Sequence, residues 1–124
     1  MLDDKEPIAT VAVRDLTIAK KFYADALGLK LASENTEVLT FIAGAFRLFV
    51  YRSTFAGTNQ ATVVTWAVGD EIDSIVTELG KRGVQFEHYD MPGLKVEGDL
   101  HVSGGGKVAW FKDPDGNILS VNGM

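Results

Sequence analysis

An internal repeat constrains what this chain can fold into. Three separate structural roles recur 55 residues apart: a strand end, a helix start and a helix end. The residues in these roles are Val13 and Val68, Asp15 and Asp70, and Gly28 and Gly83. Aspartate offers an oxygen to the free amides of a helix start, and glycine adopts the left-handed conformation that ends a helix. Because unrelated roles share one offset, the pattern indicates a duplicated unit.

The first copy has the order β-α-β-β-β. An apolar, β-branched strand is expected over 7–13, followed by a helix over 15–28 whose apolar residues recur at spacings of three and four. Short strands over 29–33, 38–42 and 46–51 follow, separated by turn residues.

The second copy begins in the same order and then differs. We expect a strand over 61–68, a helix from Asp70 to Gly83 and a strand over 84–89. The glycine-rich stretch from Tyr89 to Gly106 is predicted to be a long loop, and a loop of this length is more often a lid or binding loop than idle. The copy ends in a hairpin, because two β-prone runs flank Asp113-Pro114-Asp115-Gly116.

Composition limits the class of protein. With 124 residues, of which 46% are hydrophobic and 23% charged, the chain suits one globular domain over 1–124, with modules at about 7–52 and 61–122 and a linker at 53–60. The absence of cysteine excludes disulfides and thiolate-held metals. A net charge of -5 argues against nucleic acid and anionic membranes as partners. We expect a cytoplasmic protein, because the N-terminus is too polar for a signal peptide.

Two segments, 11–29 and 109–119, resemble the opening and closing signatures of the vicinal oxygen chelate superfamily. This superfamily includes glyoxalase I, bleomycin resistance proteins, extradiol dioxygenases and fosfomycin resistance enzymes. The resemblance implies an α+β fold in which two βαβββ modules form a curled mixed sheet around a cavity. It also implies a homodimer, since a second copy commonly completes the cavity, and an open sheet edge is better covered than left in water.

The resemblance further implies where a divalent metal would bind. Enzymes of the superfamily take one ligand, usually His or Glu, from the first and last strand of each module. These positions hold Ile8, Phe49, Val63 and Ser120 here. Hydrocarbon side chains cannot coordinate a metal and a neutral hydroxyl is a poor ligand, so we predict no metal at this place. No cofactor is predicted, and a divalent metal held by other residues stays open as an alternative.

With the four metal positions implied by the resemblance taken to face the cavity, strand alternation extends them to a ligand-binding wall, because residues two apart share a face. Trp110 has an equally good alternative in ordinary sheet packing, and Trp66 is expected in the core. Arg47 is suited to an anionic group, although surface arginines are commoner. The predicted ligand-binding residues are Thr10, Arg47, Phe49, Tyr51, Val63, Thr65, Trp110, Ser120 and Asn122.

Two classes of function remain for this sequence, and a module that only dimerises or joins a larger complex is a third alternative. The first is a metal-free protein that binds an aromatic or amphipathic small molecule, which needs only shape, apolar area and a few polar anchors. The second is an enzyme of the lyase, isomerase or dioxygenase class that uses His88 or His101 for proton transfer, or metal ligands that the alignment does not predict. For both histidines, a solvated surface position is the favoured interpretation.

Overall fold

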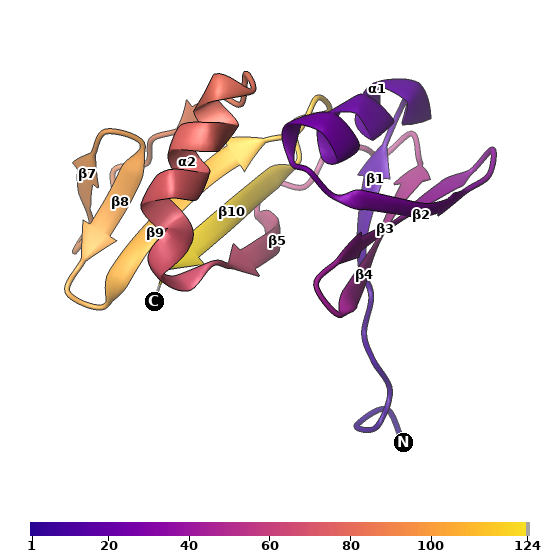
Figure 1. Cartoon of the computed structure of the whole chain (residues 1–124), viewed down its shortest axis with the longest axis horizontal. Helices are drawn as coiled ribbons and strands as arrows, with labels where there is room; N and C mark the ends of the chain where they lie inside the picture. Colours follow the sequence, from indigo (N-terminus) through magenta and orange to yellow (C-terminus); the bar gives the residue numbers. More distant parts are fainter. Residues whose placement is uncertain (124) are drawn as a thin grey trace.

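The computed structural model describes residues 1–123 and contains two separate sheets (Figure 1). The first half of the chain forms a four-stranded N-terminal sheet. Its first and last strands pair in parallel, and the other neighbours are antiparallel. In spatial order the strands are β1 (Ala9–Val13), β4 (Phe46–Arg52), β3 (Val38–Ala43) and β2 (Lys30–Glu34).

The second half forms a six-stranded C-terminal sheet with the same parallel pairing of its first and last strands. Its main path is β5 (Thr62–Ala67), β10 (Ile118–Gly123), β9 (Gly106–Lys112), β8 (Leu100–Ser103) and β7 (Lys95–Glu97). The short strand β6 (Phe86–Glu87) pairs with β9 beside β8. The repeated order confirms the predicted α+β fold of two βαβββ modules, each with its own sheet; the second module carries β7 and β8 in addition to that order.

The first helix begins at the predicted residue. Asp15 Oδ1 accepts hydrogen bonds from the amides of Thr17 at 2.8 Å and Ile18 at 3.1 Å, which caps α1 (Leu16–Lys20). The helix continues as the π-helix η1 (Lys21–Ala26) and ends at Gly28, whose φ is +74°.

The second helix starts differently from the prediction. Asp70 lies inside a 3-10 turn, η2 (Gly69–Glu71), and its side chain caps nothing, so the predicted Asp70 cap is wrong. The α-helix α2 (Ile72–Lys81) follows directly and lies across the C-terminal sheet (Figure 1). It buries Ile72, Val76 and Leu79. Within residues 1–123, no helix is both long and apolar enough to cross a membrane.

The stretch from Tyr89 to Gly106 is not one long loop, as predicted, but contains the hairpin of β7 and β8. Strand β8 adds to β9 by pairing Val102 with Lys107. The glycine-rich composition misled the prediction, because most of these glycines, at Gly93, Gly98 and Gly104–Gly105, lie in turns between short strand segments.

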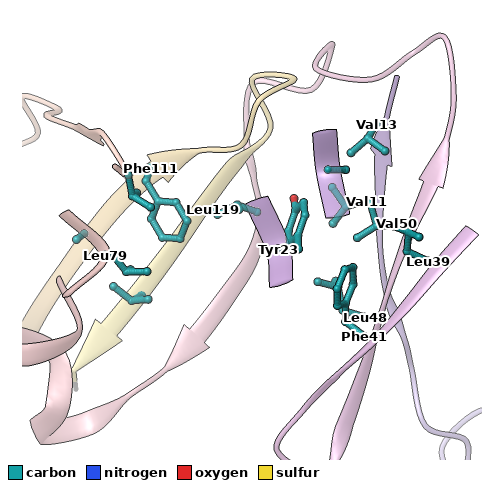
Figure 2. Packing of buried hydrophobic residues seen from close by; sticks show 14 of the residues in the cluster. Val11, Val13, Tyr23, Leu39, Phe41, Leu48, Val50, Leu79, Phe111 and Leu119 are labelled. Atoms are coloured by element: carbon teal, nitrogen blue, oxygen red, sulfur yellow. The ribbon is translucent and has the colours of Figure 1, made fainter. Parts of the chain in front are cut away.

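One hydrophobic core joins the two halves of the chain. The helix-covered faces of both sheets contribute to it, and Tyr23 of η1 lies between them (Figure 2). Tyr23, Phe41, Leu119 and Val13 are almost fully buried. Because the helical faces share this core, the opposite sheet faces, which carry most of the predicted ligand residues, lie outside it. The residues of the core are Val11, Val13, Ala19, Tyr23, Leu39, Phe41, Leu48, Val50, Ile72, Val76, Leu79, Val84, Ala109, Phe111, Leu119 and Val121.

Candidate functional site

A cavity of about 960 Å³ lies where the two halves of the chain meet. Four segments surround it: 7–9 at the start of β1, 28–30 at the corner between the first helix and β2, 42–48 across the β3–β4 turn, and 64–67 of β5. We call this space the inter-module cavity. The four segments come from both halves of the chain, so only the folded chain brings them together.

The lining of the inter-module cavity is mainly apolar. Leu29, Ile42 and Phe46 provide aliphatic and aromatic surface, and the indole of Trp66 borders the cavity from β5. Phe46 is 63% exposed, so the cavity contains a large apolar side chain that the protein itself does not cover. Polar groups come from Thr65, Lys30 and Arg47. Apolar walls with a few polar anchors are typical of sites for organic ligands.

Two of the predicted ligand-binding residues, Arg47 and Thr65, line this cavity together with Ile8. Thr65 also contacts a third predicted residue, because its Oγ1 lies 2.7 Å from Ser120 Oγ across the parallel pair of β5 and β10. Ser120 is buried and does not line the cavity.

Other predicted ligand residues lie on the N-terminal sheet outside the inter-module cavity. Thr10 pairs with Phe49 between β1 and β4, and Tyr51 pairs with Ala12 one step along the same face. Thr10 and Tyr51 are exposed, and Phe49 is half-buried. These three side chains form an open surface on one side of the sheet.

The remaining predicted residues belong to the C-terminal sheet. Val63 is half-buried and packs against the hydrophobic core, which makes it a core neighbour rather than part of the cavity wall. Asn122 is half-buried beside Ala67 of β5. Trp110 pairs with Ser120 across the sheet, and its indole Nε1 donates to Thr62 Oγ1 at 3.1 Å.

His101 does not lie in a solvated loop, which corrects the favoured prediction. It belongs to β8 and is completely buried. Its ring contacts Trp110 edge to face, with the ring centroids 4.8 Å apart, and Tyr89 at 6.1 Å. Sequence reasoning missed this burial because β8 was not recognised as a strand.

The hydrogen bonds of His101 determine which ring nitrogen carries the proton. Nε2 accepts from the Tyr89 amide at 2.8 Å, so the neutral ring has its proton on Nδ1. Within residues 1–123, neither His101 Nδ1 nor the buried Tyr89 hydroxyl has a hydrogen-bond partner. Burial, followed by the negative charge of Glu87, raises the pKa of the Tyr89 hydroxyl. With Nε2 already engaged and the ring enclosed, His101 is poorly placed to exchange protons with a substrate.

His88 lies at the surface, as the favoured prediction expected. Its Nε2 is 2.9 Å from Asp99 Oδ1, and about half of each side chain is exposed, 49% and 47%. The two histidine rings are neighbours, with centroids 6.3 Å apart. Neither histidine lines the inter-module cavity.

Comparison with known proteins decides the family. A family model described as the glyoxalase/bleomycin resistance protein/dioxygenase superfamily matches residues 7–121. The chain belongs to this superfamily. The match covers both modules and confirms the resemblance carried by the segments 11–29 and 109–119. No curated protein matches the chain in sequence.

Several solved structures share the whole fold at low sequence identity. A lactoylglutathione lyase from Agrobacterium tumefaciens is 17% identical with a TM-score of 0.74, over 97% of this chain and 93% of that one. A fosfomycin resistance protein from Listeria monocytogenes is 15% identical with a TM-score of 0.67, over 100% and 93%. An antibiotic-binding protein from a Streptomyces species is 21% identical with a TM-score of 0.70, over 99% and 98%.

The residues at the superfamily's metal positions do not fit a divalent ion. Ile8, Phe49 and Val63 have hydrocarbon side chains, and Ser120 is the fourth of these positions. Strand pairing adds only hydroxyl neighbours, Thr10 beside Phe49 and Thr65 beside Ser120. The two hydroxyls of the second pair are already hydrogen-bonded to each other, and the first pair offers one exposed hydroxyl. Residues 1–123 contain no group of three or more His, Asp or Glu side chains arranged to hold a metal. Neutral hydroxyls and hydrocarbons do not replace the hydration shell of such an ion.

Several residues of the cavity were missed by sequence reasoning. Lys30, Leu29 and Phe46 line it, but only the faces of four strands were considered in the prediction. Trp66, expected in the core, packs against the core and also borders the cavity. The available signal was that Gly28 ends the first helix and Lys30 begins the next strand. This signal does not reveal which other segments of the chain line the same cavity.

Proposed function

We propose that this protein binds an aromatic or amphipathic small molecule in the inter-module cavity without the help of a metal ion. The observation that carries the proposal is the cavity itself. Its volume of about 960 Å³ lies at the upper end of the range of small-molecule sites, roughly 300–1,000 Å³. Its lining combines apolar surface, which buries an organic ligand, with three polar side chains, which can fix the orientation of that ligand.

The superfamily supports this function without assigning it. The description of the family includes bleomycin resistance proteins, and one structure with the same fold is an antibiotic-binding protein. Lyases and fosfomycin resistance proteins share the fold as well. Since one scaffold carries several functions, the residues of the site must decide between them.

The metal-free part of the proposal rests on the donor set. The side chains of Ile8, Phe49 and Val63 have no coordinating atom, and the Ser120 hydroxyl is hydrogen-bonded to the Thr65 hydroxyl. An enzyme that depended on these positions for its metal would lack every strong ligand. Binding makes no such demand, because burial of apolar ligand surface contributes about 25 cal/mol per Å².

A homodimer belongs to the same proposal. No helix within residues 1–123 covers the face of the N-terminal sheet with Thr10, Phe49 and Tyr51, and Tyr51 is 37% exposed. A second copy that covers this face would enclose these residues and bring them into a ligand site. In this arrangement Thr10, Phe49 and Tyr51, which do not line the inter-module cavity, would contact a ligand at the dimer interface.

One observation favours an enzyme as the second candidate. The His88 imidazole is paired with the Asp99 carboxylate at 2.9 Å, and a carboxylate that orients an imidazole is a recurring feature of general bases. The pair is exposed and lies outside the inter-module cavity. Loss of a measured turnover in a His88→Ala variant, with ligand affinity retained, would support this candidate.

A cavity-filling variant tests the proposed function. N-phenyl-1-naphthylamine, a neutral aromatic probe, becomes fluorescent in an apolar site and should bind the wild-type protein. Ala67→Phe places a ring in the cavity from the exposed edge strand β5 and should abolish binding. Ala32→Phe adds the same ring to exposed β2 outside the cavity and should leave binding unchanged. Absence of binding to the wild type, or equal binding by the Ala67→Phe variant, would contradict the proposal.

A further inference from the structure

The inter-module cavity carries an excess of positive charge. Among residues 1–123, the only charged side chains that line it are Lys30 and Arg47, with no Asp or Glu. Among the ion pairs and side-chain hydrogen bonds formed within residues 1–123, none involves the side chain of Lys30 or Arg47. Both cationic groups are therefore available to a ligand.

The strand register places the two cations on one face. Lys30 of β2 pairs with Ile42 of β3, and Ile42 pairs with Arg47 of β4. Residues directly opposite each other in neighbouring strands point to the same side of the sheet, so Lys30 and Arg47 flank Ile42. Two strand spacings separate their backbones, about 10 Å. Both side chains are long enough to converge on one group above Ile42.

This local charge is opposite to that of the whole chain. The sequence has 17 acidic and 12 basic residues, so an average surface cation has a carboxylate nearby. Neighbouring cations follow that expectation: Lys20 pairs with Glu34 at 3.0 Å and Arg52 lies 3.9 Å from Glu37. The cavity differs because no acidic side chain lines it. Unpaired cations beside an apolar wall attract an anion more strongly than they would in open water.

We infer that the ligand of the inter-module cavity is an amphipathic anion, with an aromatic or other apolar frame and one acidic group. This inference rests on the proposed function and adds the chemical class of the ligand. The apolar frame packs against Ile42, which lies between the two cations on the same face of the sheet and lines the cavity. The acidic group lies between the Lys30 ammonium and the Arg47 guanidinium. A carboxylate, sulfonate or phosphate satisfies both donors, and guanidinium binds such groups through two parallel hydrogen bonds.

A matched pair of probes isolates the contribution of charge. N-phenyl-1-naphthylamine and 8-anilinonaphthalene-1-sulfonate share one aromatic frame and differ by the sulfonate. We expect Lys30→Gln and Arg47→Gln each to weaken binding of the sulfonate about threefold, and the double variant about tenfold, in line with the modest strength of exposed charge pairs. Binding of the neutral amine should change less than twofold. Naphthoate and naphthyl phosphate, measured in the same way, distinguish the acidic groups.

A charge-matched control excludes a general effect of net charge. Lys21→Gln combined with Lys81→Gln removes the same two charges from exposed positions outside the cavity. This control should leave the affinity for both probes unchanged. Raising the salt concentration should weaken sulfonate binding to the wild type and have little effect on the double cavity variant. Circular dichroism verifies that each variant is folded.

The outcomes separate the two proposals. If the amine binds the wild type and the Lys30→Gln/Arg47→Gln variant loses no affinity for the sulfonate, the ligand class is wrong while the binding function stands. An equal loss for both probes also contradicts the ligand class, because it shows that the two residues act by packing. If neither probe binds the wild type, the binding function itself fails.

Discussion

The Tyr23 hydroxyl donates a hydrogen bond to Asp113 Oδ2 over 2.7 Å and so connects the first helix to the last hairpin. The same carboxylate accepts from the Asn117 side-chain amide at 2.7 Å and from the backbone amides of Asp115 and Asn117, each at 2.9 Å. Asn117 in turn donates to the carbonyl of Ala12 in β1. A buried carboxylate is tolerated here because four donors surround it.

Replacing Tyr23 by phenylalanine should lower the free energy of unfolding by about 1–2 kcal/mol. The variant keeps the ring in the core and removes one donor from a buried carboxylate. Urea unfolding, followed by circular dichroism, measures the change. Tyr51→Phe is the control, since that residue is 37% exposed. Equal stability of the Tyr23→Phe variant and the wild type would contradict the assigned role of this contact.

Stability should fall in alkaline solution because of Tyr23. Burial, followed by the Asp113 charge and hydrogen bond, raises the pKa of its hydroxyl well above the ordinary value of 10.0. The contribution is therefore fully present below pH 10, and it decreases at higher pH because the unfolded chain releases this proton first. The loss from this group is at most about 1.4 kcal/mol per pH unit. Urea unfolding as a function of pH should show a shallower alkaline decline for Tyr23→Phe, and parallel curves would refute the prediction.

Gly57→Ala should destabilise the protein more than Gly44→Ala. Both glycines have positive φ, +74° and +60°, so alanine is strained at either position by about 1 kcal/mol. A Cβ at Gly57 would also collide with the Asp115 carbonyl oxygen, whereas nothing lies within 4 Å at Gly44. We expect a loss of about 3 kcal/mol for Gly57→Ala, because the backbone of the hairpin must shift. Similar melting temperatures for the two variants would argue against this close approach.

Protein purified without chelator should contain no stoichiometric metal. The side chains at the superfamily's metal positions lack strong ligands, so added manganese, nickel, zinc or iron should not raise the melting temperature. Elemental analysis and thermal unfolding test this, with a chelator-treated sample as the control. One bound ion per chain would overturn the metal-free proposal.

The protein should sediment as a dimer, with the open face of the N-terminal sheet in the contact. Tyr51→Glu places a charge on that face and should shift the protein toward monomer. Thr36→Glu adds the same charge in the exposed turn between β2 and β3 and should leave the dimer intact. Sedimentation velocity over a concentration series measures both. A wild type that is monomeric at every concentration would contradict the proposal.

Local signals account for the elements that sequence reasoning placed correctly. Asp15 caps the first helix, and the amide of Gly116 bonds to the carbonyl of Asp113, as expected for a turn at Asp113-Pro114-Asp115-Gly116. Both features depend on a few neighbouring residues. Asp70 is the repeat equivalent of Asp15, but it lies in a 3-10 turn and caps no helix. Similarity in sequence therefore did not guarantee the same capping geometry.

The sequence by itself determined the repeated βαβββ order, the final hairpin, and the residue types at the four metal positions that the resemblance implies. These properties follow from periodicity, turn chemistry and residue type, which act over short distances along the chain. Only the tertiary structure decided that His101 is buried and that Lys30, Arg47 and Trp66 surround one cavity. The physical reason is that a cavity between two modules depends on how their hydrophobic faces pack together, and no local pattern specifies that packing.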